Sequence, residues 1–152
     1  MNKIQIQIPE GFKIKSFDTE TGNVSFEPIP QDIKERIKTF EDVMKHLGID
    51  PEEFDDRIED MTPDEAAYVK LKHIAQALNE GWKPNWNDSN ERKYHPWFDM
   101  RSASGGFSFD GYGYWLTPSG VGSRLCFKSS ELARYAGTQF ESIYKDFLTL
   151  NS

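Results

Sequence analysis

GSRLCFKSSELARYAGTQFESIYKDFL, residues 122–148, changes its hydrophobic period once, at Ser129. Before that residue, positions 122–128 alternate between polar and apolar side chains, which predicts a β-strand. Ser129 is a preferred N-cap residue. It precedes an apolar stripe at helical spacing that consists of Leu132, Ala136, Phe140, Ile143 and Phe147. Gly137 beside this stripe lowers helix propensity by about 1 kcal/mol, so it predicts close packing of the helix on a sheet.

FSFDGYGYW, residues 107–115, contains a strong turn signal. Asp110–Gly111 at its centre is typical of a two-residue type I′ β-hairpin. With that turn, four rings share one sheet face as cross-strand pairs, namely Phe107, Phe109, Tyr112 and Tyr114. The second half of the chain therefore predicts a small antiparallel sheet covered by a C-terminal helix.

The N-terminal segment has the two-residue period of strands. Isoleucines at 4, 6 and 8 alternate with polar residues up to Pro9, which predicts a short half-buried strand. Residues 12–30 then predict a hairpin, in which Thr21, Gly22 and Asn23 form the turn.

Apolar residues at helical spacing follow from Ile33 to Leu47, and Gly48 is a residue type at which a helix commonly ends. Thr39 with Asp42 forms a start signal inside this stretch, so one helix or two remain open.

Two further start signals follow, and both contain proline. Asp50-Pro51-Glu52-Glu53 and Thr62-Pro63-Asp64-Glu65 each combine a capping residue, proline at the first helical position and an acid at the third. Gly81 ends the second helix, whose buried stripe is Ala67, Leu71, Ile74 and Leu78. The fold class is thus α+β in one domain, residues 1–152: a helical first half with an N-terminal β-hairpin, then the sheet and its covering helix.

The composition excludes several classes of protein. No apolar run approaches the ~20 residues of a membrane span, and the N-terminus lacks the apolar block of a signal peptide. A single cysteine, Cys126, excludes a disulfide framework. His46, His73 and His95 lie far apart without cysteine partners, so we expect no metal site and no cofactor. The expected compartment is the cytoplasm.

The net charge of −7 is concentrated in one segment. Between Asp50 and Glu65 nine acids stand against the single base Arg57. Such a field favours a basic protein partner and disfavours nucleic acid on this face. The other interpretation is a solvated helix surface with acids near helix N-termini. The candidate protein-contact residues are Asp50, Glu52, Glu53, Asp55, Asp56, Glu59 and Asp60.

Several blocks, among them "IQIPEG", "AYVKLKHIAQALNEGW" and "YHPWF", together with most of residues 122–148, resemble a family of small proteins found in phages and prophages of Bacteroides-type bacteria. The resemblance runs from Ile6 to Leu148, apart from the glycine-rich stretch 102–122. It assigns no activity, cofactor or catalytic residue. What it implies is context: a phage-encoded protein that works in the cytoplasm of the bacterial host or is packaged in the virion.

Residues 82–115 hold ten aromatic side chains interleaved with cations. Rings beside cations suit single-stranded nucleic acid or a nucleotide, because bases stack on the rings while Lys and Arg neutralise phosphates. The alternative is that the rings fill a core that is poor in aliphatic residues. We expect Trp82 and Trp86 to be the exposed pair. The candidate stacking and anion-binding residues are Trp82, Trp86, Arg92, Lys93, Trp97, Arg101 and Arg124.

The sequence also contains three weaker signals of a functional site. Cys126 with His95 is a thiolate–imidazole combination, but a mid-strand cysteine is more often a small buried hydrophobe. SGVGSR, residues 119–124, is compatible with an anion-holding backbone nest, which Arg124 would assist. The acidic segment lacks the glycine and the alternating ligands of a calcium loop.

We therefore expect a non-enzymatic, phage-derived binding protein that acts through contacts with a host or phage protein. Host-factor inhibition and a virion-associated role both remain open. The alternative function is a single-stranded nucleic acid or nucleotide-binding module that uses residues 82–128.

Overall fold

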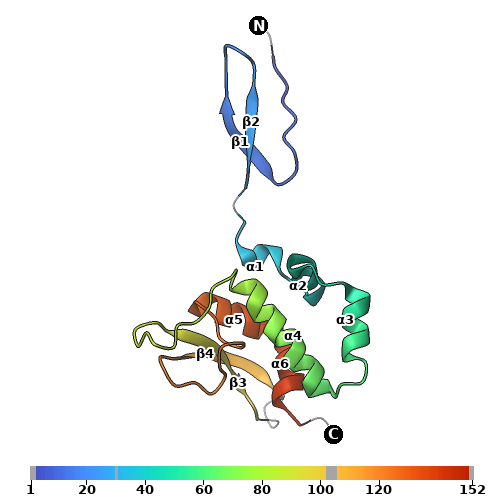
Figure 1. The fold of residues 1–152 in the computed structure, drawn as a ribbon, viewed down its shortest axis with the longest axis vertical. Coiled ribbons are helices and arrows are strands. Elements are labelled where there is room, and N and C mark those ends of the chain that lie inside the picture. Colours follow the sequence, from blue (N-terminus) through green and yellow to red (C-terminus); the bar gives the residue numbers. More distant parts are fainter. Residues whose placement is uncertain (1–2, 30, 102–105, 151–152) are drawn as a thin grey trace. The chain divides into compact units, whose positions relative to one another are not determined.

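The computed structural model describes residues 3–29, 31–101 and 106–150. The chain divides into two compact units, Met1–Asp32 and Ile33–Ser152, and each is described by itself (Figure 1). The first contains a β-hairpin and the second contains helices and a two-stranded sheet. The predicted α+β class is confirmed. Residues 102–105, in the glycine-rich stretch, lie outside the described residues.

The first unit is built on the predicted hairpin. Strands β1 (Phe12–Phe17) and β2 (Val24–Pro28) pair antiparallel. Their turn is closed by Asp18, whose carboxylate accepts a hydrogen bond from the backbone N–H of Glu20 at 2.9 Å. The strand expected over Ile4–Ile8 is wrong, because these residues have no strand partner and alternation alone does not make a ladder.

The stretch for which the sequence allows one helix or two contains two, α1 (Ile33–Arg36) and α2 (Phe40–Leu47). Thr39 separates them with a capping box, in which its hydroxyl accepts from the Asp42 N–H and the Asp42 carboxylate accepts from the Thr39 N–H. Gly48 ends α2 in the left-handed conformation with φ 70°, as predicted.

Helices α3 (Pro51–Ile58) and α4 (Pro63–Leu78) start where their capping sequences predict. The Asp50 carboxylate accepts from the N–H groups of Glu52 and Glu53, at 2.9 and 3.1 Å. The buried stripe of α4 is also confirmed, with Ala67, Leu71, Ile74 and Leu78 at most 3% exposed.

The sheet of the second unit differs from the prediction. Residues 107–115 do not fold into a hairpin; they contain one strand, β4 (Ser108–Trp115), which pairs antiparallel with β3 (Lys93–Asp99). The Asp110–Gly111 pair forms a β-bulge instead, because the register shifts between Pro96 and Phe98, and Gly111 has a φ of 107°. A glycine that permits a turn also permits a bulge, and Lys93–Asp99, for which the sequence pattern predicts no strand, supplies the competing partner strand.

The predicted shared face of the rings survives this change. Tyr114, Tyr112 and Phe109 lie opposite Tyr94, Pro96 and Phe98, which alternate along β3 and so point to one side. Phe107 stacks on Phe98 with ring centroids 4.7 Å apart. Tyr94, Phe98 and Phe107 pack against the core, as the core interpretation of these rings predicts. Tyr112 and Tyr114, by contrast, are 36% and 45% exposed.

Residues 122–128 form no strand in the structure, so the strand predicted for this segment is wrong. Only Phe127 pairs, in an isolated bridge to Tyr94. The alternation is wrong as well, because Leu125, Cys126 and Phe127 are all buried. The backbone groups on either side of Phe127 face the other edge of this segment, where the Asn79 side chain bonds to the Cys126 carbonyl and the Lys128 N–H.

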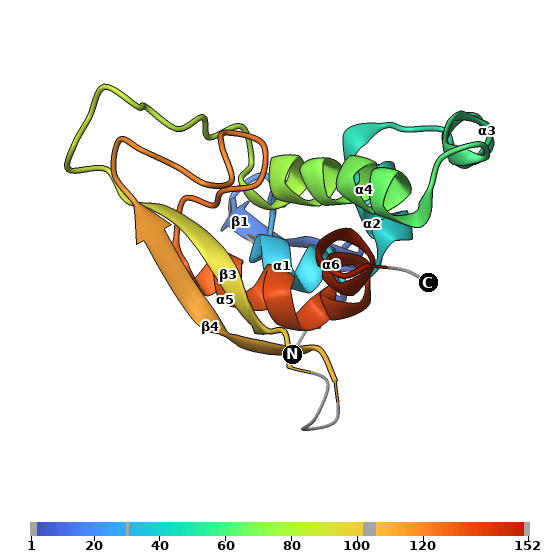
Figure 2. The ribbon, with the colours of Figure 1, turned by 90° about the horizontal axis from the view of Figure 1, so that it is seen from below.

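The C-terminal helix begins after Ser129, as predicted, but it breaks at Phe140, whose φ is −114°. It forms α5 (Ser130–Gln139) and α6 (Glu141–Leu148). Figure 2 shows α5 lying along the β3–β4 sheet. The close approach predicted at Gly137 is confirmed, because a Cβ there would lie 2.5 Å from the Phe109 ring and 2.8 Å from Pro96.

We predict that Gly137→Ala lowers the free energy of unfolding by about 1–3 kcal/mol, although alanine is the better helix former, because its methyl group forces α5 off the sheet. Denaturant unfolding followed by tryptophan fluorescence measures this change. Gly120→Ala is the control, since nothing lies within 4 Å of its Cβ position. Equal stability of the two variants would contradict close packing at Gly137.

Candidate functional site

A groove of about 630 Å³ lies between the C-terminal half of α4, the loop that follows it and residues 123–124. We call it the α4 groove. Its lining residues are Lys72, His73, Ala75, Gln76, Asn79, Gly81, Trp82, Lys83, Pro84, Ser123 and Arg124. The volume falls in the range of sites for small ligands.

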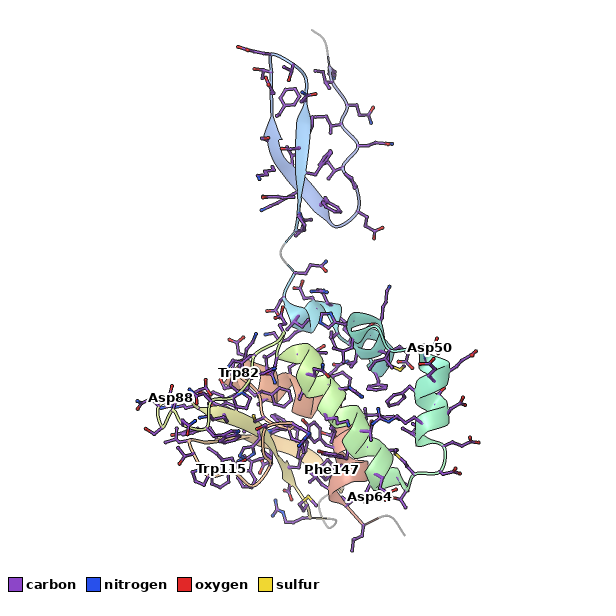
Figure 3. All side chains as sticks on the ribbon, in the orientation of Figure 1. Asp50, Asp64, Trp82, Asp88, Trp115 and Phe147 are labelled. Atoms are coloured by element: carbon purple, nitrogen blue, oxygen red, sulfur yellow. The ribbon has the colours of Figure 1, made fainter. Side chains whose placement is uncertain are left out.

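A chain reversal after α4 places the indole in the groove wall. The helix ends at Leu78, and Glu80 and Gly81 then take positive φ angles of 49° and 87°. The Trp82 N–H donates to the Asn79 carbonyl at 3.0 Å, which closes the turn. Figure 3 shows Trp82 near the C-terminal end of α4 and Asp64 at the opposite end.

Asn79 also holds the opposite wall. Its side-chain amide donates to the Cys126 carbonyl at 2.9 Å, and its carbonyl accepts from the Lys128 N–H at 3.0 Å. The residue is 6% exposed, so both bonds lie in a medium where an unpaired polar group is costly. These bonds fix the segment that carries Ser123 and Arg124 beside α4.

The groove is positively charged although the protein is acidic. Lys72, Lys83 and Arg124 line it, and no carboxylate is among the lining residues. The C-terminal dipole of α4 opposes an anion with the equivalent of about half a charge, which three cations outweigh. The nearest acid in the sequence, Glu80, is paired with Lys128 at 3.8 Å.

His73 is also among the residues that line this groove. Burial lowers the pKa of this imidazole, and both of its ring nitrogens are buried without a hydrogen-bond partner among the described residues. Its ring meets Phe54 of α3 edge-on, with centroids 6.1 Å apart. At neutral pH the ring therefore adds no charge to the groove.

The structure does not bring the predicted stacking and anion-binding residues together in one site. Trp82 and Arg124 line the groove, but Trp86 and Lys93 brace the loops behind it. The Trp86 indole N–H donates to the Ser123 hydroxyl at 2.7 Å. Lys93 is fully buried, and its ammonium donates to the carbonyls of Asp88 and Leu116 at 3.0 and 2.7 Å. Trp82 and Trp86 are both partly buried, so the expectation that they form the exposed pair is wrong.

The remaining members of that set have other contacts. The Arg92 guanidinium lies 4.6 Å from the ring centre of Tyr114. Trp97 is 50% exposed and contacts His95 on the opposite side of β3 from Tyr94. Arg101 pairs with Asp99 at 2.6 Å and holds the pKa of that carboxyl at about 2.

The two weaker chemical signals have structural explanations. Burial raises the pKa of Cys126 to about 11, so its thiol stays protonated, and its contact is the Ser123 carbonyl at 3.7 Å. His95 stacks on Trp115. In the predicted nest, the N–H groups of Val121 and Gly122 donate to the Ser119 hydroxyl, which already occupies them.

The acidic segment forms an exposed surface. Phe54 points inward against Phe40, with ring centroids 5.0 Å apart, while the charged side chains face outward. Throughout the described ranges, none of these carboxylates lies in an ion pair within 4 Å. We call this set the α3 acidic surface: Asp50, Glu52, Glu53, Asp55, Asp56, Glu59 and Asp60.

Comparison of the chain with protein-family models, curated proteins and solved structures found no significant match. The class that the fold and groove define is therefore a two-unit α+β protein with a cationic groove in an acidic chain. None of the helices in the described part of the chain has the length and hydropathy that a membrane span requires. In the same residues, no three potential metal ligands gather.

We predict that the protein loses stability as the pH falls from about 7.5 to 5.5. Burial lowers the pKa of His95 and of His73, so the unfolded chain takes up protons at a higher pH than the folded one. The contribution of these two neutral histidines to the free energy of unfolding is complete above the unfolded-state pKa of about 6.5 and declines below it. Urea unfolding at the two pH values measures this loss.

His95→Phe should show a smaller loss over the same interval, since phenylalanine can occupy the position beside Trp115 without titrating. The exposed His46 serves as the control, and His46→Gln should behave as the unmodified protein. An equal loss in all three proteins would rule out His95 as a source of the pH dependence.

Proposed function

We propose that this protein is a non-catalytic binding protein whose α4 groove takes an anionic ligand with a flat ring, either a nucleotide or a short single strand of nucleic acid. The observation that carries the proposal is the composition of the groove: three cations and one indole without a carboxylate. In a chain of net charge −7, such a local excess of positive charge is a strong departure from the average.

The chemistry matches the two parts of such a ligand. A base that stacks on an indole gains about 1–3 kcal/mol, and every base has a face that can stack. Lys72 and Lys83 approach from α4 and its loop, and Arg124 from the opposite wall, so phosphate oxygens would meet cations from both sides. Gln76 adds an exposed amide group that can bond to a base edge.

The rigid walls favour binding without large rearrangement. Asn79 fixes the Ser123–Arg124 segment, and Trp86 bonds to Ser123 from behind. Groups held by a folded frame lose less conformational entropy when a ligand arrives. The buried, protonated thiol of Cys126 supports a binding role over nucleophilic catalysis.

The second candidate function is contact with a basic host or phage protein through the α3 acidic surface. The observation that favours it is the absence of ion pairs on this surface within the described residues, because such carboxylates are available to cations of a partner. The phage-family resemblance would supply the context: host-factor inhibition in the bacterial cytoplasm or a place in the virion.

We predict that Trp82→Ala weakens binding of fluorescent oligonucleotides or nucleotides by about tenfold or more, through the lost stacking. Arg124→Ala should weaken binding and reduce the slope of log K against log salt by about one. Fluorescence anisotropy over a salt series measures both quantities.

Trp97→Ala is the matched control, since it removes an exposed indole that does not line the groove. It should bind as the unmodified protein does. No binding at low salt, or an equal effect of all three changes, would refute a nucleotide or nucleic acid function of the groove.

For the second candidate, we predict that Glu52→Gln with Glu53→Gln reduces recovery of a basic partner from infected-host lysate by about fivefold at low salt, through slower association. Glu35→Gln with Glu41→Gln removes the same charge from exposed positions outside the α3 acidic surface. A partner lost equally with both pairs, or retained with both, would count against a specific acidic docking surface.

A further inference from the structure

The outer side of β4 is a free strand edge in the second unit. The sheet has two strands, and the isolated bridge of Phe127 is made to β3, so no described segment pairs with β4 on its other side (Figure 2). Unpaired backbone N–H and C=O groups along such an edge are a template for a further strand.

The hydrogen bonds of Tyr94 show which backbone groups of β4 point outward. Its N–H donates to the Phe127 carbonyl at 3.0 Å, and its carbonyl accepts from the Phe127 N–H at 2.7 Å, so both groups point away from β4. Tyr114, opposite Tyr94, therefore belongs to a pair without hydrogen bonds to β3. The N–H and C=O groups of Tyr114 and of Tyr112 thus point to the outer edge. Pro96, opposite Tyr112, agrees with this assignment because it has no N–H to donate.

Only part of this edge is open to a partner. Within the ranges that the structure describes, no group bonds to the outward N–H and C=O groups of Tyr112 and Tyr114. At the start of β4, by contrast, the Phe109 N–H donates to the Glu141 carboxylate at 2.9 Å. The open part is therefore residues 112–115, which follow the bulge.

Two arginines lie over the tyrosine rings of this open part. The Arg92 guanidinium is 4.6 Å from the ring centre of Tyr114, and the Arg134 guanidinium is 4.8 Å from that of Tyr112. Both arginines are exposed. Neither of them is in an ion pair with any described residue. The edge is therefore marked by two cations on one sheet face.

The acids near these arginines in the sequence have other partners. Glu91 pairs with Lys93 at 3.6 Å, and Glu131 pairs with Lys34 at 3.2 Å. Opposite charges on neighbouring strands stabilise their pairing, whereas like charges directly opposite destabilise it. The two arginines therefore favour an added strand that carries acids.

We propose that an extended, acidic segment of a partner protein adds to the β4 edge as a further strand, antiparallel to β4. Its backbone bonds to the outward groups of Tyr112 and Tyr114. The two residues opposite these tyrosines share their sheet face and lie about 7 Å apart, because a strand rises by about 3.4 Å per residue. Acids at these positions meet Arg134 and Arg92, so the recognised pattern is two acids separated by one residue.

Two other occupants fit this edge less well. A second copy, paired through β4 about a two-fold axis at Gly113, would bring Arg134 of one copy beside Arg92 of the other, where like charges repel. A strand of nucleic acid has no alternating N–H and C=O groups to match the edge. Its bases would also compete with the two guanidinium groups for the faces of the tyrosine rings.

Binding of a labelled peptide to the full chain, measured by fluorescence anisotropy at low salt, tests the proposal. The probe is a heptapeptide in which valine and glutamate alternate, and it should bind. The same peptide with lysine in place of each glutamate should not bind. N-methylation of the glutamates removes the N–H groups that face β4 and should weaken binding by about tenfold or more. N-methylation of the valines changes only the far side of the added strand and should leave binding unchanged.

Arg92→Gln combined with Arg134→Gln should weaken binding of this peptide by about tenfold or more. Lys45→Gln with Arg57→Gln is the matched control, because it removes the same charge from exposed positions of α2 and α3. All four tryptophans lie in the second unit, so an unchanged fluorescence spectrum shows that this unit is folded in each variant. An equal loss with both pairs would overturn the proposed role of the two arginines.

Amide hydrogen exchange of the full chain, followed by NMR, checks the edge directly. The amides of Tyr112 and Tyr114 should exchange fast, and those of Gly113 and Trp115 slowly, because the latter two face β3. The peptide should slow exchange at the two tyrosines. Slow exchange there without peptide would overturn the proposal, because the edge would already be covered by this chain or a second copy. No binding of the peptide, equal binding of both N-methylated forms, or tighter binding of an oligonucleotide at these residues would overturn it as well.

Discussion

The side chain of Asn79 makes the two hydrogen bonds on which the second unit depends. It lies just beyond α4 and bonds to the backbone on both sides of Phe127, at Cys126 and Lys128. Phe127 in turn bonds to Tyr94 of β3 through its own N–H and carbonyl. One amide group thus connects the end of the longest helix to the segment that bridges to the sheet through Phe127. Because the bond to Cys126 is shielded from water, its loss would leave a buried backbone carbonyl without this partner.

The groove is a consequence of this connection. The chain reversal at Glu80 and Gly81 returns Trp82 to α4, while the Asn79 bonds hold Ser123 and Arg124 on the other side. Lys93 stabilises the loops behind the groove, since a buried ammonium needs oxygen partners and finds them in two loop carbonyls. The cations that line the groove, unlike Lys93, do not hold loops together. Their arrangement, and not the net charge of the chain, supports the proposed affinity for an anion.

Sequence patterns predicted the helices well and the second sheet poorly. The caps at Thr39, Asp50, Thr62 and Ser129 all stand where their residue types indicate, because a cap involves groups only two or three positions apart. The β3 strand has no such signal: it contains Pro96 and a buried lysine, and its partners lie nine or more positions away. For the same reason Asp110–Gly111 was predicted as a turn. Its glycine permits both a turn and a bulge, and only the presence of β3 distinguishes them.

The candidate site shows the same division. By itself, the sequence determined the capped helix starts at Asp50, Thr62 and Ser129, the buried stripe of α4, the exposed acidic surface and the close approach at Gly137. All of these follow from short-range periodicity, caps and residue volume. Only the tertiary structure decided that Trp82 and Arg124 share a groove with Lys72 and Lys83, while Trp86 and Lys93 support it from behind. Trp82 and Trp86 have the same side chain and lie close in the sequence, but they have different roles. The backbone N–H of Trp82 bonds to Asn79, whereas the indole of Trp86 bonds to Ser123. A hydrogen bond from a side chain to a distant backbone group leaves no periodic mark in the sequence.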